Sequence, residues 1–124
     1  MRRIGIIDHQ DALAGHTAYD LASLLFDARL DVPATLEADL FAYSVAQRQQ
    51  RDPAFDADHF TLAYATLAAQ RNTKILGIFA RLAKRDGRPG YLMHLPRIRS
   101  YLARALAHEW LAELRDWYRR NLPG

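Results

Sequence analysis

The chain has 124 residues, of which half are hydrophobic, and it contains no cysteine. This length and composition predict one globular domain over residues 1–124, and the missing cysteines exclude disulfides, thiolate nucleophiles and zinc–thiolate sites. No apolar run approaches the roughly 18 residues of a membrane span, and the apolar residues that follow Met1 are too few for a signal peptide. We therefore expect a cytoplasmic protein with no membrane partner.

The formal net charge of +3 suggests nucleic-acid binding only if the basic residues cluster. They recur instead at spacings that place most of them on the outer faces of helices. A solvated face explains this pattern better, so we expect no nucleic-acid partner. The five histidines show no pair at helical i, i+4 spacing, which argues against a zinc or iron site.

The N-terminal stretch concentrates the chemistry of the chain. A β-branched run predicts a short strand over residues 3–7 that ends at Asp8, and Asp11 follows three residues later. A carboxylate at the end of a strand is a common position for a metal ligand. Aspartate is also common in turns because its side chain bonds its own backbone, and spacing alone favours that second interpretation.

The rest of the sequence is predicted to be helical. Thr17 and Asp20 fit the T-x-x-D capping pattern, which predicts a helix over residues 17–30 that ends before Pro33. Apolar periodicity predicts four further helices: 34–50, a long one from Asp56 or Asp58 to about Arg85, one that begins near His94 or Leu95, and 109–121.

The apolar positions of these helices predict which faces are buried. They include a stripe of Leu36, Leu40, Tyr43 and Ser44 widened by Phe41 and Val45, and a later set of Leu111, Leu114, Trp117 and Tyr118. The stretch around Gly77 is apolar on nearly all sides, which predicts burial with a close helix approach at the glycine. One short strand and five helices favour a mainly α fold over an α/β sheet.

Two stretches resemble a known family. The segment IDHQDALAGHTAYDLASLL is similar to the metal-binding segment of the aminoglycoside phosphotransferase family, with matches at Asp8, Asp11, Ala12, Gly15, Asp20, Leu21 and Ala22. Residues 68–102 resemble the C-terminal region of the bacterial cell-wall amino-sugar kinases within that family, the N-acetylmuramate/N-acetylglucosamine kinases. The first stretch begins at residue 7 and the second ends at residue 102, so the region between these limits includes most of the chain.

The resemblance implies the helical C-terminal lobe of a protein-kinase-like fold that uses ATP and Mg²⁺ to phosphorylate a small-molecule sugar. Asp8 would bind Mg²⁺, Asp11 would be a second ligand or act through a bound water, and Asp20 would brace the catalytic loop or cap its own helix. His9 stands where the family usually has an aromatic residue.

The chain departs from the family in a larger way. It contains no Gly-rich nucleotide loop, no matching strand lysine and no H-x-D-x-x-x-x-N catalytic loop. We therefore expect no catalytic residue in this chain and interpret it as the C-terminal part of a kinase that is inactive alone. The alternative is a helical interaction module that has lost catalysis.

Four polar residues within or beside apolar helical stretches are weak candidates for the wall of a sugar pocket: Asp27, Arg29, Gln70 and Arg71. The predicted strand 3–7 would lack the partner strand that it has in the family. Its exposed edge suggests a homodimer that forms through this strand.

Overall fold

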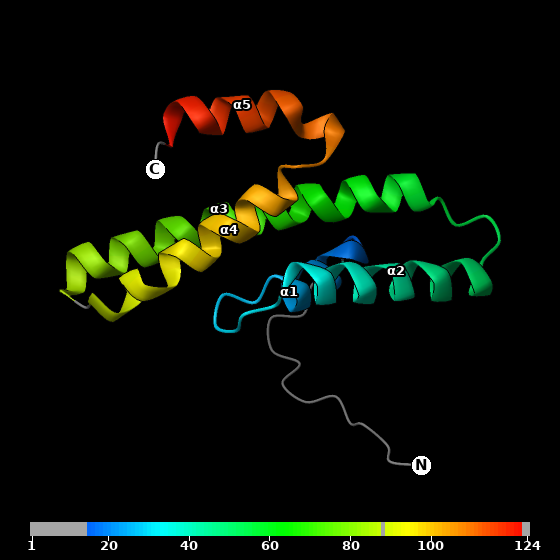
Figure 1. The fold of residues 1–124 in the computed structure, drawn as a ribbon, viewed down its shortest axis with the longest axis horizontal. Coiled ribbons are helices and arrows are strands. Elements are labelled where there is room, and N and C mark those ends of the chain that lie inside the picture. Colours follow the sequence, from blue (N-terminus) through cyan, green and yellow to red (C-terminus); the bar gives the residue numbers. More distant parts are fainter. Residues whose placement is uncertain (1–14, 88, 123–124) are drawn as a thin grey trace, which may run out of the picture.

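The computed structural model describes residues 15–87 and 89–122, and this part of the chain is mainly helical. Its α-helices are α1 (Ala18–Leu25), α2 (Ala34–Arg51), α3 (Ala57–Asp86), α4 (Leu95–Ala105) and α5 (Ala112–Asn121), with 3-10 helices η1 (Pro89–His94) and η2 (Glu109–Leu111). Figure 1 shows the long α3 across the middle with α4 beside it, α1 and α2 below this pair and α5 above it.

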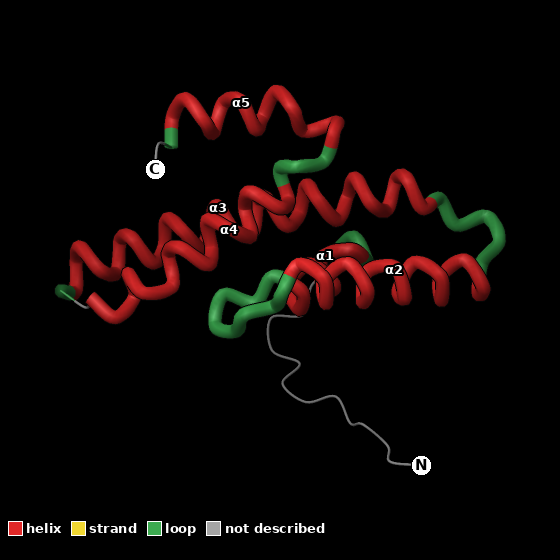
Figure 2. The backbone as a smooth tube through the Cα atoms, viewed as in Figure 1, coloured by secondary structure: helices red, strands yellow, loops and turns green. Residues whose placement is uncertain are grey.

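The prediction of a mainly α protein is confirmed. The tube in Figure 2 passes from helix to helix through short loops, and the described residues contain no strand. The strand predicted over residues 3–7, and the homodimer predicted through it, lie outside the described residues.

The longest helix begins and ends where the sequence predicts. Asp56 is the N-cap of α3, and its Oδ1 accepts a hydrogen bond of 3.0 Å from the backbone N–H of His59. The helix ends at Gly87, whose φ of 59° is left-handed, a conformation that glycine adopts without the steric cost of a Cβ.

The main core lies where α1, α3 and α4 meet. Ala18 and Ala22 of α1 are fully buried, and Ala68 is buried on the facing side of α3. These small side chains let the two helices approach closely, while Phe26 fills the space beside them and its ring meets Tyr101 of α4 edge-on with 5.5 Å between centroids. Burying one aromatic residue of this size stabilises the fold by roughly 1.5–3 kcal/mol.

The first helix differs from its prediction at both ends. It stops at Leu25 rather than residue 30, because Asp27 Oδ1 accepts the N–H of Arg29 at 2.8 Å and so closes a local turn in place of another helical turn. The predicted Thr17 cap is wrong. Thr17 makes no capping hydrogen bond, and the N–H of Ala18 donates instead to Nδ1 of His16 at 3.1 Å.

Helix α2 contacts the core through Phe41 and Val45, the predicted widening of its stripe, but not through most of the predicted central stripe. Leu36, Leu40 and Tyr43 are exposed, the last at 65%. The neighbouring positions 37, 41 and 45 face α3: the Phe41 ring lies 4.4 Å from the Tyr64 ring between centroids, and the Tyr64 hydroxyl donates to Glu37 Oε1 at 2.7 Å. Of these three positions only Glu37 was not predicted, because a polar side chain does not indicate packing.

The predicted close approach at Gly77 is also wrong. Gly77 is exposed, and a Cβ built there would meet no atom within 4 Å. Only Leu76 in this apolar stretch is buried, where it packs with Ile98 of α4 in a second, smaller core cluster.

The last helix buries less than predicted. Leu114 and Trp117 are 39% and 51% exposed. Of the predicted set, Tyr118 does pack against the main core, and its hydroxyl lies 2.5 Å from that of Thr73. Arg115, which was not predicted, donates to the carbonyl of Leu106 at 3.0 Å.

The loop between α1 and α2 is held by side chains of α4. The Tyr101 hydroxyl accepts the N–H of Val32 at 2.8 Å and donates to the carbonyl of Leu30, and Arg104 Nη2 donates to the carbonyl of Val32 at 2.9 Å. One turn earlier, Arg97 donates to the carbonyl of Ala28 at 3.1 Å. Three residues of α4, at i, i+4 and i+7, therefore satisfy the carbonyls of Ala28, Leu30 and Val32 and the N–H of Val32, which lie outside any helix.

We predict that Tyr101→Phe lowers the free energy of unfolding by about 1–3 kcal/mol, because it leaves two partly buried backbone groups of the loop without this partner. Urea denaturation followed by circular dichroism measures this change. The matched control is Tyr43→Phe on the exposed face of α2, for which we expect a change within about 0.5 kcal/mol. Equal stability of the two variants would contradict a structural role for the Tyr101 hydroxyl.

Candidate functional site

Helix α1 follows the predicted metal-binding segment directly. Asp8 and Asp11 lie outside the described residues, so their role as metal ligands stays a prediction. Asp20 lies in the first turn of α1 and is exposed, and its proposed bracing of a catalytic loop also stays a prediction.

A polar cluster lies where α1 faces α3. Arg71 of α3 places its guanidinium 6.0 Å from the centre of the Tyr19 ring, a cation–π distance, and Nη1 donates to the Tyr19 hydroxyl at 3.4 Å. The Nε atom of Arg71 is buried and has no hydrogen-bond partner among the described residues. Sequence reasoning did not predict Tyr19 as a site residue. The available signal was its spacing to the polar residues Asp20 and Ser23, which places it on the more exposed side of α1.

Asp27 lies in the turn that ends α1, and its side chain is 19% exposed. Besides the backbone N–H of Arg29, its carboxylate accepts Nε of Arg29 at 3.4 Å and Nη2 at 3.5 Å. Partial desolvation raises the pKa of Asp27, but the hydrogen bonds from Arg29 and the charges of Arg29 and Arg71 together outweigh it, so this pKa lies below its ordinary value. Asp27 is therefore a carboxylate at neutral pH.

Three of the four predicted pocket residues are thus brought together. Arg71 lies close enough to act on the charge of Asp27, and Asp27 bonds Arg29 directly. Gln70 is exposed on α3, about 100° around the helix from Arg71, and its role stays a prediction. The grouping supplies one carboxylate and two guanidinium groups, which are strong partners for the hydroxyl, amide and carboxylate groups of a small polar ligand.

The α4 side chains that hold the loop also fix a second acid beside this cluster. Arg97 Nε donates to Asp31 Oδ1 at 2.5 Å, and this hydrogen bond, with the charge of Arg97, outweighs desolvation and holds the pKa of Asp31 below its ordinary value. Sequence reasoning missed Asp31 and Arg97 because they are 66 positions apart. The recurrence of Arg97, Tyr101 and Arg104 on one face of α4 was the available signal.

A separate cavity of about 460 Å³ lies at the start of α3, lined in part by Asp56, His59, His108 and Trp110. The His59 ring lies 5.8 Å from that of His16, just before α1. Among the described residues, no group of three acidic or histidine side chains is arranged to hold a metal ion.

Comparison with known proteins identifies relatives of the chain, although no family model matches it. It is 42% identical over 121 residues to an N-acetylmuramate/N-acetylglucosamine kinase of Caulobacter vibrioides, which covers 98% of the chain. Proteins of the same name from Neisseria meningitidis serogroup B and Pseudomonas aeruginosa are 40% and 38% identical over 82% and 89% of the chain. The chain is homologous to part of these amino-sugar kinases.

This homology confirms the resemblance to the amino-sugar kinases drawn from the sequence. The chain spans about a third of the length of the curated relatives it matches, with 32%, 31% and 33% of the three proteins covered. No helix in residues 15–87 and 89–122 is long and apolar enough to cross a membrane.

We predict that Arg29→Gln raises the pKa of Asp27 part of the way to its ordinary value, because the backbone N–H of residue 29 and the charge of Arg71 remain. NMR titration of the carboxyl carbon measures this pKa. Since the folded-state pKa is depressed, the stability that it contributes is present above the unfolded pKa of about 3.9 and is lost as pH falls through the folded value.

The control for this titration is Arg51→Gln, at the exposed end of α2. It removes the same charge at a distance from the turn and should leave the Asp27 titration unchanged. If both variants shift the Asp27 pKa equally, the long-range net charge, and not the turn, sets it.

Proposed function

We propose that the chain supplies the substrate side of an ATP-dependent kinase that phosphorylates a hydroxyl group of an amino sugar. The observation that carries this proposal is the homology, at 42% identity over 98% of the chain, to a protein named N-acetylmuramate/N-acetylglucosamine kinase. On this proposal residues 1–124 form one unit, the helical C-terminal lobe of a kinase-like fold, and work in the cytoplasm where ATP is available.

The polar cluster between α1 and α3 supports an amino-sugar substrate. Asp27 is ionised and therefore accepts hydrogen bonds from sugar hydroxyl groups, whereas the guanidinium groups of Arg29 and Arg71 donate to an N-acetyl carbonyl or to an acidic substituent. N-acetylmuramate carries a carboxylate, which a guanidinium binds in a two-pronged geometry. Gln70 would extend the same wall along α3.

The metal would be held before α1. Asp8 and Asp11 offer carboxylate oxygens, the donor type that Mg²⁺ prefers, and Mg²⁺ usually takes only one or two carboxylates from a protein. When bound, the ion neutralises charge on the phosphoryl group as it is transferred. Asp20, one turn into the exposed face of α1, would brace the catalytic loop.

The general base and the nucleotide lysine would come from other polypeptide, since the 124 residues contain no H-x-D-x-x-x-x-N stretch. We accordingly expect that the chain alone, with ATP, Mg²⁺ and either sugar, releases ADP no faster than a buffer blank. Turnover by the isolated chain would contradict the proposal that the general base and the nucleotide lysine come from other polypeptide.

The direct test is a chimera in which residues 1–124 replace the aligned region of the Caulobacter vibrioides kinase. We predict that the chimera phosphorylates N-acetylmuramate or N-acetylglucosamine and that Asp8→Asn lowers its kcat on the order of 10³-fold, because the change removes a charged metal ligand at constant volume. Coupled ADP release measures the rate, and Asp11→Asn should be milder if Asp11 acts through a metal-bound water.

Asp39→Asn, on an exposed position of α2, is the matched control and should leave kcat within about twofold of the parent chimera. A folded chimera with no sugar phosphorylation would refute the proposed function. Normal turnover of the Asp8→Asn chimera at saturating Mg²⁺ would show that Asp8 is a turn residue. That result would refute the proposed metal site but not the proposed kinase function.

A further inference from the structure

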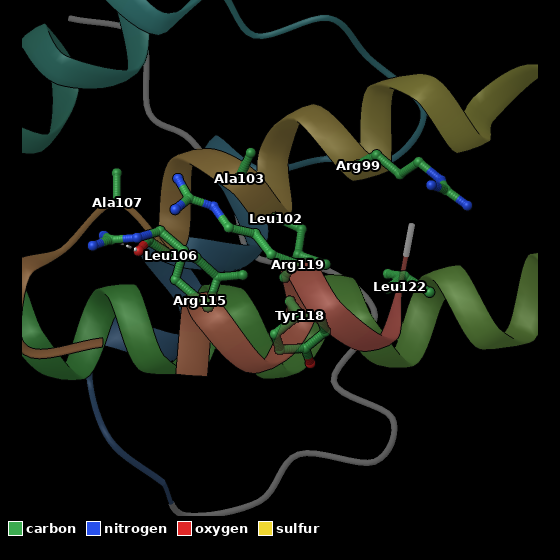
Figure 3. Close-up of a pocket in the computed structure, with 9 residues that line it drawn as sticks. All are labelled: Arg99, Leu102, Ala103, Leu106, Ala107, Arg115, Tyr118, Arg119 and Leu122. Carbon is green, nitrogen blue, oxygen red and sulfur yellow. Dashed lines mark hydrogen bonds between the residues drawn. The ribbon is translucent and has the colours of Figure 1, made fainter. Parts of the chain in front are cut away.

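A groove of about 520 Å³ runs between α4 and α5, at a place unconnected with the sugar cluster. Figure 3 shows its walls: Leu102 comes from α4 and Leu106 directly follows that helix, whereas Tyr118 lies on α5 and Leu122 directly follows it. Leu102 and Leu106 are buried, and Tyr118 is half-buried. The floor of the groove is therefore apolar and is built mainly by residues that also belong to, or pack against, the main core.

Three arginines line the same groove: Arg99 of α4 and Arg115 and Arg119 of α5. In Figure 3 the guanidinium groups of Arg115 and Arg119 lie toward the C-terminal end of α4, while Arg99 extends toward the other end of the groove. The nine described residues that line the groove include no carboxylate. The electrostatic character of the groove is therefore strongly positive.

Within the part of the chain that the structure describes, Arg115 and Arg119 leave most of their hydrogen-bond donors without a protein partner. Arg115 uses Nη1 for the carbonyl of Leu106, and Arg119 makes only a loose ion pair of 3.6 Å with Asp116, with its side chain 73% exposed. Each guanidinium carries five N–H groups, and an exposed ion pair of this length contributes little. The guanidinium groups of Arg115 and Arg119 can therefore donate hydrogen bonds to a ligand that lies on the apolar floor of the groove.

The dimensions fit a small molecule. Sites for small ligands usually enclose about 300–1,000 Å³, are lined mainly by apolar side chains and contain a few polar groups that fix orientation. The groove has this composition, and Ala103 and Ala107 on its α4 side leave room that larger side chains would fill.

We propose that the α4–α5 groove is a binding site for a small anionic amphiphile. The apolar part of the ligand lies on Leu102, Leu106 and Leu122, and its carboxylate, sulfonate or phosphate group accepts hydrogen bonds from Arg115 and Arg119. A bound ligand would join α5 to α4, whereas without it α5 meets the fold through a few contacts such as Tyr118 with Thr73. This site is independent of the proposed kinase function.

The probe is 8-anilinonaphthalene-1-sulfonate, whose fluorescence rises in an apolar site, titrated into the 124-residue chain. Its matched neutral probe is N-phenyl-1-naphthylamine, which has the same rings without the sulfonate. We expect saturable binding of the anionic probe at one site, and binding about tenfold weaker for the neutral one, as expected for the loss of one charge-assisted hydrogen-bonded group.

Two substitutions on one helix locate the anion. Arg119→Gln should weaken binding of the sulfonate probe by about fivefold to tenfold and leave the neutral probe unchanged, because it removes a cation from the groove. Arg120→Gln removes the same charge from the next position, which does not line the groove, and should change either affinity by less than about twofold. Circular dichroism of each variant controls for folding.

A third substitution tests the floor. Ala103→Leu fills the groove from an exposed position of α4 and should abolish binding of both probes without loss of stability. Equal effects of Arg119→Gln and Arg120→Gln would overturn the proposal, as would full binding to the Ala103→Leu variant. Failure of the sulfonate probe to bind saturably would overturn it too, and none of these results would bear on the chimera.

Discussion

The structure depends on hydrogen bonds from one face of α4 to the backbone between α1 and α2. Tyr101 and Arg104 hold Val32, and Arg97 holds Ala28. A loop that leaves α1 after only eight helical residues has many unpaired backbone groups, and each one buried without a partner would cost about 1–3 kcal/mol. Because α4 forms hydrogen bonds with backbone groups of this loop, it fixes the path of the loop. The position of the start of α2 and the orientation of the turn at Asp27 depend on that path.

This constraint links the core to the proposed sugar site. Tyr101 packs its ring against Phe26 in the core and uses its hydroxyl on the loop, so the same residue stabilises both. The turn that contains Asp27 and Arg29 directly follows the core residue Phe26. Arg71 lies on α3, close behind Ala68 and Ala69, which pack in the core, and its charge acts on Asp27. Asp27 and Arg71 therefore lie next to buried core residues, and a site that orients a small substrate requires such support.

Sequence reasoning succeeded where the determinants are local. Two examples are Asp56 as the N-cap of α3 and a helix that begins near Leu95 with Pro96 in its first turn, and both follow from a few adjacent residues. It failed where two stripes of similar spacing compete. In α2 the apolar Leu36, Leu40 and Tyr43 remain exposed because the docking side includes a glutamate that bonds Tyr64.

The candidate site was only partly predictable for the same reason. Asp27, Arg29 and Arg71 stood out as polar residues beside apolar stretches, and the fold brings them together. Their positioning depends on Arg97, Tyr101 and Arg104, whose acceptors are backbone carbonyl and N–H groups of residues about 70 positions away. Every residue type has a backbone carbonyl, and all but proline have a backbone N–H. The sequence therefore does not indicate which backbone groups these side chains bond.

The most direct test of the proposed function is a crystal structure of the chimeric kinase with Mg²⁺, ADP and N-acetylmuramate or N-acetylglucosamine bound. We predict that an Asp8 oxygen lies about 2.0–2.1 Å from the Mg²⁺ ion and that the sugar forms hydrogen bonds with Asp27 or Arg71. A metal ion bound without Asp8, together with a sugar bound away from the turn at Asp27, would contradict the assignment of this chain to the substrate side of an amino-sugar kinase.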